Sequence, residues 1–592
     1  ALVGAVPVIT PFIVNNPGEA AQAKRRIGAL TLGHLTPPMV DAGTHGETAE
    51  LEQLFDEYAE ALALDPRRAR LIGRTILDLA RERDLLPEPA RAADPESALA
   101  VLDNWLCDIK ETRIGDGLHT FGRTCQVSCD PTSRPSGHLL SKGEKGAEPV
   151  AADLLDACGP AERAGLSRAL DGRFVPPGPS GAPSRGRLDV LPTGRNLYSV
   201  DPRGVPTRTA AEIGVRMAED LCTRYAQDHG DWPRSVMLDL WGSASMRTGG
   251  DDLAQAFALL GTRPRWDHGS GRVSGFDILP LARLGRARVD VTLRISGLFR
   301  DAFPDQIRLF DAAVRAVADL DEEDADNPLA AAHRQRASLI RVFGAAPGQY
   351  GVGVAEALTL DAETARDVLG TTYIDASAHP FGAAAEPAPA ADLFRDRVAA
   401  ADAFSHTTDL PGQDVLESDT LAEHLGGFAA AAALLGTRPS LYHADASRPD
   451  VVRLRGLADA VTEALHARAT NPRWITGQMR HGHRGAISLG ETLDALCTLA
   501  ATTTSVPSRH FDLYFDATLG DDTVRAFLHD ANPAVARDMA RRFATARANG
   551  WWHTRRNSVG MILADMCPDQ HGRLPSSADL AGRIRAVPEV VT

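Results

Sequence analysis

Two nearly continuous apolar runs, separated by helical segments, constrain the fold of this chain most. The runs are Val236–Trp241 and Val289–Ile295, and amphipathic patterns typical of helices cover 209–228, 252–260 and 304–320. A strand reads as a continuous apolar run when both of its faces are buried, and alternation with helices is typical of βαβ units. The pattern therefore predicts a parallel sheet with helices on both faces.

The N-terminal region predicts a second βαβ unit. An apolar, β-branched strand at 6–14 is followed by a helix over 20–27 and a further extended run at 30–34. Beyond residue 321 the pattern is mainly helical and rich in alanine, with polar interruptions. We therefore expect an α/β fold of parallel βαβ units with helices on both faces, followed by a mainly helical C-terminal region.

With 592 residues the chain is long enough for several cores. We expect residues 1–123 to form an α/β and then helical segment, and 151–320 to form an α/β domain with a parallel sheet. Residues 321–592 are expected to form a mainly helical domain. Residues 124–150, rich in Ser, Pro, Gly and Lys without an apolar period, are predicted to be a flexible insertion.

Charge and cysteine usage narrow the class of function. The net charge of -15 disfavours a nucleic-acid partner, because phosphate binding usually requires a basic face. The seven cysteines are scattered without Cys-x-x-Cys pairs, which fits a reducing cytoplasm. The apolar start, 1–14, contains two prolines and is too short to cross a bilayer, so we expect no membrane association.

The first polar loop after a predicted strand is Asn15-Asn16-Pro17-Gly18-Glu19, and it has two interpretations. In one, Asn16 is the N-cap and Glu19 the N3 residue of a capping-box-like helix start. In the other, the backbone N–H groups of the same helix start bind a substrate carboxylate, with the basic run 24–26 nearby.

Two further loops follow the central strands, and each carries an arginine and at least one aspartate. Arg247 lies in the loop 242–252, and Arg300 precedes Asp301 in the loop 296–301. Ligands of open parallel sheets bind at the carboxyl ends of the strands. The arginines either pair with neighbouring aspartates to hold the loops, or bind ligand carboxylates while an aspartate handles protons or metal.

Histidines gather in the C-terminal half, and a phosphate-binding loop is missing. His481-Gly-His483 supplies a local pair of possible metal ligands, whereas His406 and His424 stand apart in sequence. The chain contains no Gly-x-x-x-x-Gly-Lys-Ser/Thr motif. We therefore expect any ATP that the reaction uses to be hydrolysed by another protein.

Several long strings resemble the large subunit of cobaltochelatase, of the family that contains CobN and the magnesium chelatase H-type proteins. The matching strings span 1 to about 558 and include these six: Pro11–Arg26, Gly33–Pro38, Leu191–Pro202, Leu240–Gln255, Ser296–Pro304 and His424–Phe428.

The resemblance implies a tetrapyrrole-binding subunit that inserts Co(II) into hydrogenobyrinic acid a,c-diamide during cobalamin biosynthesis. Two smaller subunits of the AAA+ type are then expected to hydrolyse ATP, and the chain to act as a metal chelatase only with them. The alternatives are a magnesium chelatase H-type protein that inserts Mg(II) into protoporphyrin, and a non-catalytic tetrapyrrole-binding paralogue. In the family, a glutamate segment serving chelation precedes the Asn-Asn-Pro block, and a chain beginning here is expected to hold part of the ring site without it.

The matching blocks suggest roles for the polar residues. We expect substrate binding by six residues: Asn16, Glu19, Arg195, Asn196, Arg247 and Arg300. The arginines would hold the carboxylates of the ring. We expect proton or metal transfer by Asp301, His406 and His424, and metal binding by His481 and His483.

Overall fold

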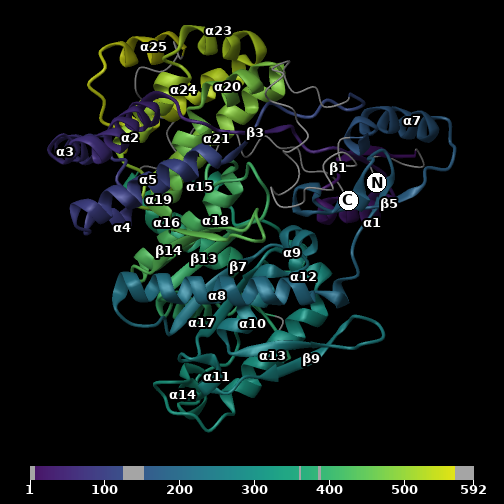
Figure 1. The fold of residues 1–592 in the computed structure, drawn as a ribbon. Helices are drawn as coiled ribbons and strands as arrows, with labels where there is room; N and C mark the ends of the chain where they lie inside the picture. Colours follow the sequence, from purple (N-terminus) through teal and green to yellow (C-terminus); the bar gives the residue numbers. More distant parts are fainter. Residues whose placement is uncertain (1–6, 124–152, 359–361, 384–387, 567–592) are drawn as a thin grey trace.

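The computed structural model describes residues 7–123, 153–358, 362–383 and 388–566. A small N-terminal sheet lobe stands to one side of a larger body, and the body consists of a central sheet and a helical lobe (Figure 1). The predicted insertion at 124–150 lies outside the described residues.

The small lobe contains the predicted N-terminal βαβ unit, which is confirmed. Strand β1 (Ile9–Ile13) leads into helix α1 (Pro17–Ile27), and β2 (Leu30–His34) returns parallel to β1. The sheet order is β1-β2-β6-β5, completed by β6 (Asn196–Tyr198) and β5 (Pro177–Pro179). Helix α7 (Cys158–Leu170) packs against β2.

The central sheet has seven strands in the order β12-β11-β10-β7-β13-β14-β15. The two predicted strands, β7 (Ser235–Leu240) and β10 (Asp290–Ile295), are parallel neighbours in which every residue is buried. The inner strands are parallel, and the two edge strands are antiparallel to their neighbours. The remaining strands are β11 (Val342–Gly344), β12 (His379–Phe381), β13 (Ala403–Thr408), β14 (Ser440–Asp445) and β15 (Arg453–Gly456).

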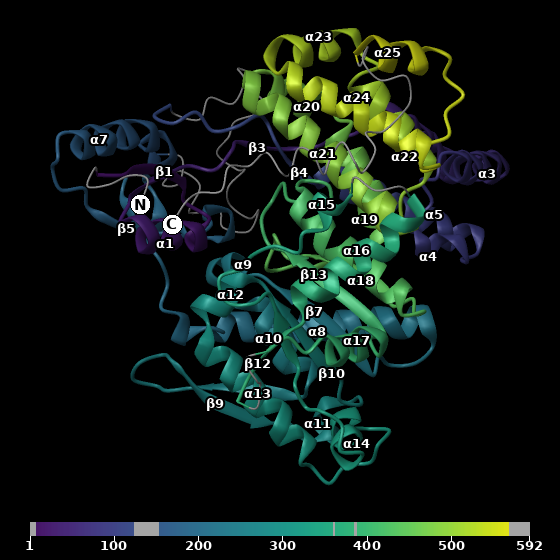
Figure 2. The ribbon, with the colours of Figure 1, turned by 180° about the vertical axis from the view of Figure 1, so that it is seen from behind.

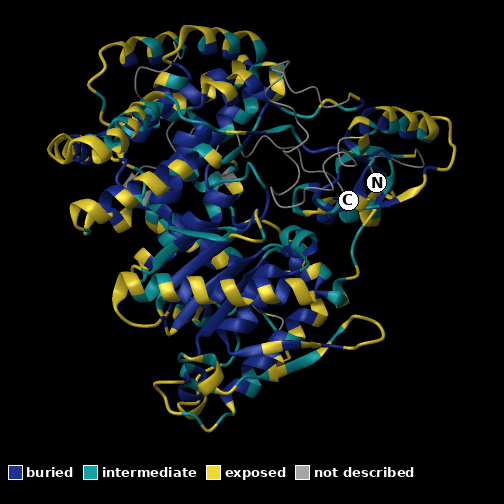
Figure 3. Cartoon of the chain, in the orientation of Figure 1, coloured by how far each residue is buried: buried dark blue, intermediate teal, exposed yellow. Residues whose placement is uncertain are grey.

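Helices cover both faces of this sheet, as predicted (Figures 1 and 2). On one face lie α8 (Arg208–His229), α10 (Asp251–Leu259) and α13 (Pro304–Ala318), packed on strand residues such as Val236 and Leu238. On the other face lie α16 (Ala362–Ser377) and α18 (Asp419–Leu434), packed with Met237 and Phe404. Figure 3 shows the strands as a buried layer between exposed helix surfaces.

Strands from both sides of residue 320 pair in the central sheet, so the predicted division at that residue does not coincide with an edge of the sheet. The strand β13 pairs with β7, and β11 pairs with β10. These later strands are short or carry polar residues, as in Ser405 and His406, and their pattern predicts a loop instead of a strand.

Two segments expected as loops are short helices. Residues after β7 form α9 (Gly242–Thr248), and residues after β10 form α12 (Gly297–Ala302). Each helix starts with a glycine, one residue after the strand ends. Because α9 and α12 contact one another, they set the shape of the carboxyl edge of the sheet.

The helical lobe combines two segments that are far apart in the sequence, 46–111 and 457–566. Helices α2 (Gly46–Leu64), α3 (Pro66–Glu82), α4 (Glu88–Arg91) and α5 (Pro95–Glu111) bury a core that also includes Ala467. The C-terminal helices are α19 (Leu457–Ala464), a π-helix (Leu465–Ala469), α20 (Pro472–Met479), α21 (Gly482–Thr502), α22 (Ser508–Ala517), α23 (Asp522–Ala531), α24 (Pro533–Ala548) and α25 (Ser558–Met566).

The smaller elements include β3 (Met39–Asp41) paired with β4 (Arg113–Gly115), the hairpin β8 (Thr262–Trp266) and β9 (Val273–Ile278), and the helices α11 (Leu281–Leu284), α14 (Pro328–Arg334), α15 (Val354–Ala357) and α17 (Ala391–Ala399). No helix in the described ranges combines the length and the apolar character that a membrane crossing requires.

Candidate functional site

The carboxyl edges of the two sheets meet at one contact, which we call the seam: residues 15–18 of the small lobe against helices α9 and α12 of the body. A Cβ added to Gly18 would lie 2.3 Å from Leu298 Cδ2 and 2.7 Å from Ser243 Oγ. Only glycine therefore allows α1 to approach the two strand-end helices this closely. The seam lies where open α/β sheets bind ligands.

Arg247 crosses the seam and is fully engaged there. Its Nε and Nη2 donate to the two oxygens of Asp409 at 2.6 and 2.7 Å, and its Nη1 donates to the Asn15 carbonyl at 2.9 Å. Both side chains of the ion pair are buried. The structure thus gives Arg247 the loop-holding role, with Asp409 in place of a sequence neighbour as its partner.

An acidic cluster lies behind this ion pair. Asp251 receives a hydrogen bond from Arg185 Nη2 at 2.5 Å, and Asp252 receives one from Ser245 Oγ at 3.1 Å. Burial, which is opposed in part by Arg185, raises the pKa of Asp251 to about 6. Burial raises the pKa of Asp252 to about 7, and the charge of Asp251 adds to the effect. The cluster therefore takes up a proton near neutral pH.

Arg300 holds its own loop but keeps one donor group free. Its Nε donates to Asp301 Oδ1 at 2.8 Å, and its Nη1 donates to the carbonyls of Ala345 and Ala346 at 2.9 and 2.6 Å. Its Nη2 is buried and makes no hydrogen bond to the described residues. A buried N–H group without an acceptor is costly, so this group is suited to a ligand oxygen.

Asp301 and Tyr350 connect Arg300 to the small lobe. The Tyr350 hydroxyl donates to Asp301 Oδ2 at 2.7 Å and accepts from Arg26 Nη2 at 2.6 Å, and the Arg300 guanidinium lies over the tyrosine ring. Burial alone would raise the pKa of Asp301, but the hydrogen bonds from Arg300 and Tyr350 lower it below its ordinary value. Asp301 is therefore an ionised, partly exposed carboxylate at the seam.

Asn16 occupies the N-cap position of α1, with Pro17 in the first turn as predicted. Its side chain makes no capping hydrogen bond, and Asn16 Oδ1 is buried without a partner among the described residues. Glu19 is exposed on the first turn of α1. The predicted capping-box-like interaction is therefore wrong, because the Asn16 side chain accepts no hydrogen bond from the helix start.

Arg195 and Asn196 belong to the small lobe. Arg195 Nη2 donates to the Asp189 carbonyl at 2.7 Å, and Asn196 Oδ1 accepts from Lys24 Nζ on α1. Burial lowers the pKa of Lys24. These contacts fasten β6 to α1 and the preceding loop.

His406 and His424 come together beneath the seam around a carboxylate that the sequence did not single out. Asp239 Oδ2 lies 2.8 Å from Nδ1 of each histidine and accepts from Trp241 Nε1 at 2.8 Å. The strand pairing of β7 and β13 sets Asp239 beside His406, while His424 comes from α18. The predicted third partner, Asp301, makes its contacts at the seam instead.

A buried guanidinium sets the charge of this cluster. Arg294 on β10 forms an ion pair with Asp239 at 3.4 Å and lies 3.0 Å from His424 Nδ1. Although burial opposes it, the hydrogen bonds from His424 and His406 and the charge of Arg294 hold the pKa of Asp239 well below its usual range. Burial and Arg294 lower the pKa of His424 to about 4, so His424 is neutral at pH 7.

The predicted metal pair, His481 and His483, does not converge. His481 Nε2 accepts from the Leu118 backbone N–H at 2.8 Å, while the His483 side chain is exposed. Within the described part of the chain, no group of three or more His, Cys, Asp or Glu residues is arranged to hold an ion. A third titratable cluster, His34, His119 and Glu162 in the small lobe, was not predicted, because its members are far apart in sequence.

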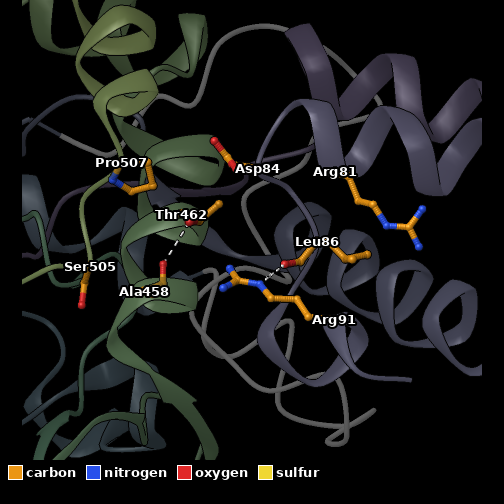
Figure 4. A pocket seen from close by; sticks show the side chains of 8 residues that line it. All are labelled: Arg81, Asp84, Leu86, Arg91, Ala458, Thr462, Ser505 and Pro507. Carbon is orange, nitrogen blue, oxygen red and sulfur yellow. Dashed lines mark hydrogen bonds between the residues drawn. The ribbon is translucent and has the colours of Figure 1, made fainter. Parts of the chain in front are cut away.

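The helical lobe contains a depression of about 320 Å³, shown in Figure 4. It is lined by Arg81, Asp84, Leu86, Arg91, Ala458, Thr462, Ser505 and Pro507. In Figure 4 Arg91 Nε donates a hydrogen bond to the carbonyl of Leu86, and the Thr462 hydroxyl donates one to the carbonyl of Ala458. None of the predicted site residues lines this depression.

Comparison with known proteins gives consistent matches along the chain. The family model described as CobN/Magnesium Chelatase matches residues 1–129 and 137–559. The chain is 40% identical to the aerobic cobaltochelatase subunit CobN of a Sinorhizobium species, over 95% of this chain and 54% of that protein. It is 31% identical to the H-type protein of the magnesium chelatase of Cereibacter sphaeroides, over 93% of this chain and 45% of that protein.

A solved structure agrees with these matches. The catalytic subunit of cobaltochelatase from Mycobacterium tuberculosis superposes with a TM-score of 0.85 at 34% identity, over 96% of this chain and 55% of that one. The chain thus spans about half the length of the relatives it matches.

Proposed function

This chain belongs to the CobN/magnesium chelatase family, and from that premise we propose that it is the ring-binding part of an aerobic cobaltochelatase large subunit. Its reaction is the insertion of Co(II) into hydrogenobyrinic acid a,c-diamide in cobalamin biosynthesis. The observation that carries the proposal is the 40% identity to a CobN protein over nearly the whole chain, against 31% for the H-type protein of a magnesium chelatase.

The seam is the proposed cradle for the ring. Its free groups are complementary to a polyanionic macrocycle: Arg300 Nη2 offers a buried donor for a peripheral carboxylate, and Asn16 Oδ1 offers an acceptor for an amide or a pyrrolic N–H. The basic residues 24–26 on α1 add positive charge beside them. Arg247 supports this cradle from behind, since Asp409 and Asn15 already occupy its donors.

Metal insertion requires a base that removes the pyrrolic protons. Asp301 is proposed for this step, because it is ionised, partly exposed and next to Arg300. His406 and His424 are proposed as positioning residues. Their imidazoles are hydrogen-bonded to Asp239, which also accepts a hydrogen bond from Trp241 at the start of α9. Glu19, Arg195 and Asn196 form the outer part of the cradle in this proposal. His481 and His483 have no role in it, because His481 is bound to the Leu118 N–H and His483 is exposed.

ATP hydrolysis is assigned to two AAA+ partner subunits, because the chain carries no phosphate-binding loop motif. The proposed compartment is the cytoplasm. The four cysteines in the described ranges, Cys107, Cys158, Cys222 and Cys497, are free thiols, which fits a reducing environment.

Ring binding by the purified chain tests the proposal. Hydrogenobyrinic acid a,c-diamide is titrated and its absorbance recorded, with protoporphyrin as the competing ring. We expect tighter binding of the corrin precursor, and a loss of about 10- to 100-fold in affinity for Arg300→Gln, as one lost charge-assisted hydrogen bond implies.

Arg265→Gln is the matched control, because Arg265 is an exposed arginine on the hairpin β8–β9 with a surface ion pair to Asp277. Equal affinity of the Arg300→Gln variant and the parent chain would remove Arg300 from the cradle. Preference for protoporphyrin, together with Mg(II) insertion in the presence of ATP and the partner subunits, would replace the cobalt assignment by the magnesium one.

A further inference from the structure

Arg185 reaches from the small lobe into the body and is buried there. It ends a 3-10 helix (Pro183–Arg185) between β5 and β6, so its backbone belongs to the small lobe, which lies to one side of the body in Figure 1. Its side chain is nevertheless only 5% exposed. A cationic side chain that is buried outside its own lobe requires acceptors from the other one.

The Arg185 guanidinium finds these acceptors in three separate segments of the body. Its Nη2 donates to Asp251 Oδ2 at 2.5 Å. Its Nη1 donates to the carbonyl of Ala446 and lies 3.5 Å from the carbonyl of Asp409. Because the Asp251 side chain is 1% exposed, the contact is a buried ion pair that backbone acceptors complete.

All three acceptors lie beyond the carboxyl ends of neighbouring strands of the central sheet. Asp409 directly follows β13, and Ala446 directly follows β14. Asp251 begins α10, which follows α9 at the end of β7. Since β7, β13 and β14 are adjacent and parallel, Arg185 docks the small lobe on the edge where open α/β sheets bind ligands.

Arg247 joins the same two lobes in the opposite direction. Its guanidinium belongs to the body and donates to the Asn15 carbonyl of the small lobe. Its carboxylate partner is Asp409, whose backbone carbonyl faces Arg185. The two arginines therefore attach the lobes at two points, which restrains the rotation of the small lobe as well as its distance from the body.

The free groups of the proposed cradle come from opposite sides of this junction. Asn16 Oδ1 belongs to the small lobe, whereas Arg300 Nη2 belongs to α12 of the body. The contacts that join the lobes therefore set the position of one group relative to the other. The hydrogen bonds of the Arg185 guanidinium go to neither residue, so its influence on them is indirect.

We propose that Arg185 is a positioning residue for ring binding: it fixes the small lobe on the carboxyl ends of β13 and β14 and thereby sets Asn16 relative to Arg300. The inference rests on the proposed ring-binding function. Arg185 and its acceptors cover the ends of β13 and β14, so the ring is left the part of the edge at β7 and β10, beside α9 and α12.

Titration of Arg185→Gln and Arg185→Lys with hydrogenobyrinic acid a,c-diamide tests the role, at a temperature at which circular dichroism shows each variant folded. We expect Arg185→Gln to lose about 10-fold or more in ring affinity, because a binding site requires its groups to be held within about 0.5 Å. Arg185→Lys should recover part of the loss, since it keeps the charge for Asp251 but not the fork that reaches several acceptors.

Arg288→Gln is the matched control for a loss of stability alone. Arg288 is also a buried arginine that pairs with a carboxylate, Glu322 at 2.7 Å, and donates to backbone carbonyls. It precedes β10 and so lies at the amino edge of the sheet, away from the seam. Arg288→Gln should lower the free energy of unfolding but keep the ring affinity of the parent chain.

Parent-like ring affinity of folded Arg185→Gln would overturn the inference, and so would equal losses of affinity in Arg185→Gln and Arg288→Gln. If Arg185→Gln does not fold, Asp251→Asn decides, because it removes the charge of the acceptor and keeps its size. A lower ring affinity of Asp251→Asn supports the role, and parent-like affinity contradicts it.

Small-angle X-ray scattering of the ring-free chains separates this inference from the proposed function. A loosened small lobe should give Arg185→Gln a larger radius of gyration than the parent and Arg288→Gln, and equal radii would contradict the docking role. A parent chain that binds the ring, with Arg185→Gln binding equally well, keeps the proposed function and loses this inference. A parent chain that binds no ring loses the proposed function and the ring-positioning role together, even if the scattering shows that Arg185 holds the lobe.

Discussion

Replacing Asp239 by asparagine removes the carboxylate that holds four donors beneath the seam. Asp239 accepts from Trp241, contacts His406 and His424 at 2.8 Å each, and pairs with Arg294, whose side chain is 1% exposed. Asparagine keeps the shape but leaves the Arg294 charge buried without a counter-ion. Removing one partner of a buried ion pair costs about 3–5 kcal/mol.

This cost is a large part of the stability of a folded domain, which is about 5–15 kcal/mol. For a cooperative unit of about 150–250 residues, it corresponds to a fall in Tm of about 6–20 °C. The assay is thermal and urea unfolding of Asp239→Asn followed by circular dichroism. The matched control is Asp277→Asn, because Asp277 pairs with Arg265 at the surface, where an ion pair contributes about 0–1 kcal/mol.

Two results would refute this reasoning about Asp239. The first is an unfolding free energy within about 1 kcal/mol of the parent chain. The second is a double variant, Asp239→Asn with Arg294→Met, that is no more stable than Asp239→Asn alone, because removing the stranded charge should recover part of the loss.

Three further changes test the seam and its acidic cluster. Gly18→Ala should lower the free energy of unfolding by about 1–3 kcal/mol, since its Cβ meets packed atoms. Gly204→Ala should change it little in the same urea series, because a Cβ at that position would meet only the Gly271 carbonyl oxygen, at an ordinary contact distance of 3.9 Å. Because the folded-state pKa of Asp252 is raised to about 7, the folded chain binds an extra proton between about pH 4 and 7, and this group makes stability fall as pH rises through that window. The free energy of unfolding of Asp252→Asn, compared with that of the parent chain, should therefore increase from pH 5 to pH 8. The same difference between variant and parent at both pH values would contradict the raised pKa of Asp252. Tyr350→Phe should raise the pKa of Asp301, because it removes a hydrogen bond to the ionised carboxylate. Carbon NMR of the carboxyl group measures this pKa, and an unchanged value would show that Tyr350 does not stabilise the ionised form of Asp301.

The sequence predicts the strands that are buried on both faces and misses those that carry chemistry. The runs at β7, β10 and β2 are apolar, so their period and length are readable, and the structure confirms them. By contrast β13, with the sequence Ala-Phe-Ser-His-Thr-Thr, reads as polar. It is a strand because the sheet buries its backbone, and because Asp239 on the neighbouring strand satisfies its histidine.

The sequence indicates where the polar residues lie along the strands, but not which partners they contact. Arg247 and Arg300 do lie at strand ends, as the loop positions indicated, but Arg247 pairs with Asp409, 162 positions away. Likewise His34, His119 and Glu162 come from three separate segments. Such pairs depend on the packing of one lobe against another, and no local pattern of residues records that packing.

Side chains whose hydrogen-bonding atoms all have partners differ in role from side chains that keep an atom without a partner. The first hold the structure of the site, and the second have an atom available for a ligand. Arg247, Asp239 and Glu162 each use several hydrogen-bonding atoms within the described fold, so their substitution should act through structure. Arg300 Nη2 and Asn16 Oδ1 keep a free atom at the seam. Buried polar atoms without partners are costly, and in the proposed cradle a polar ligand would complete both of these atoms. The substitutions that separate binding from folding should therefore be those at Arg300 and Asn16.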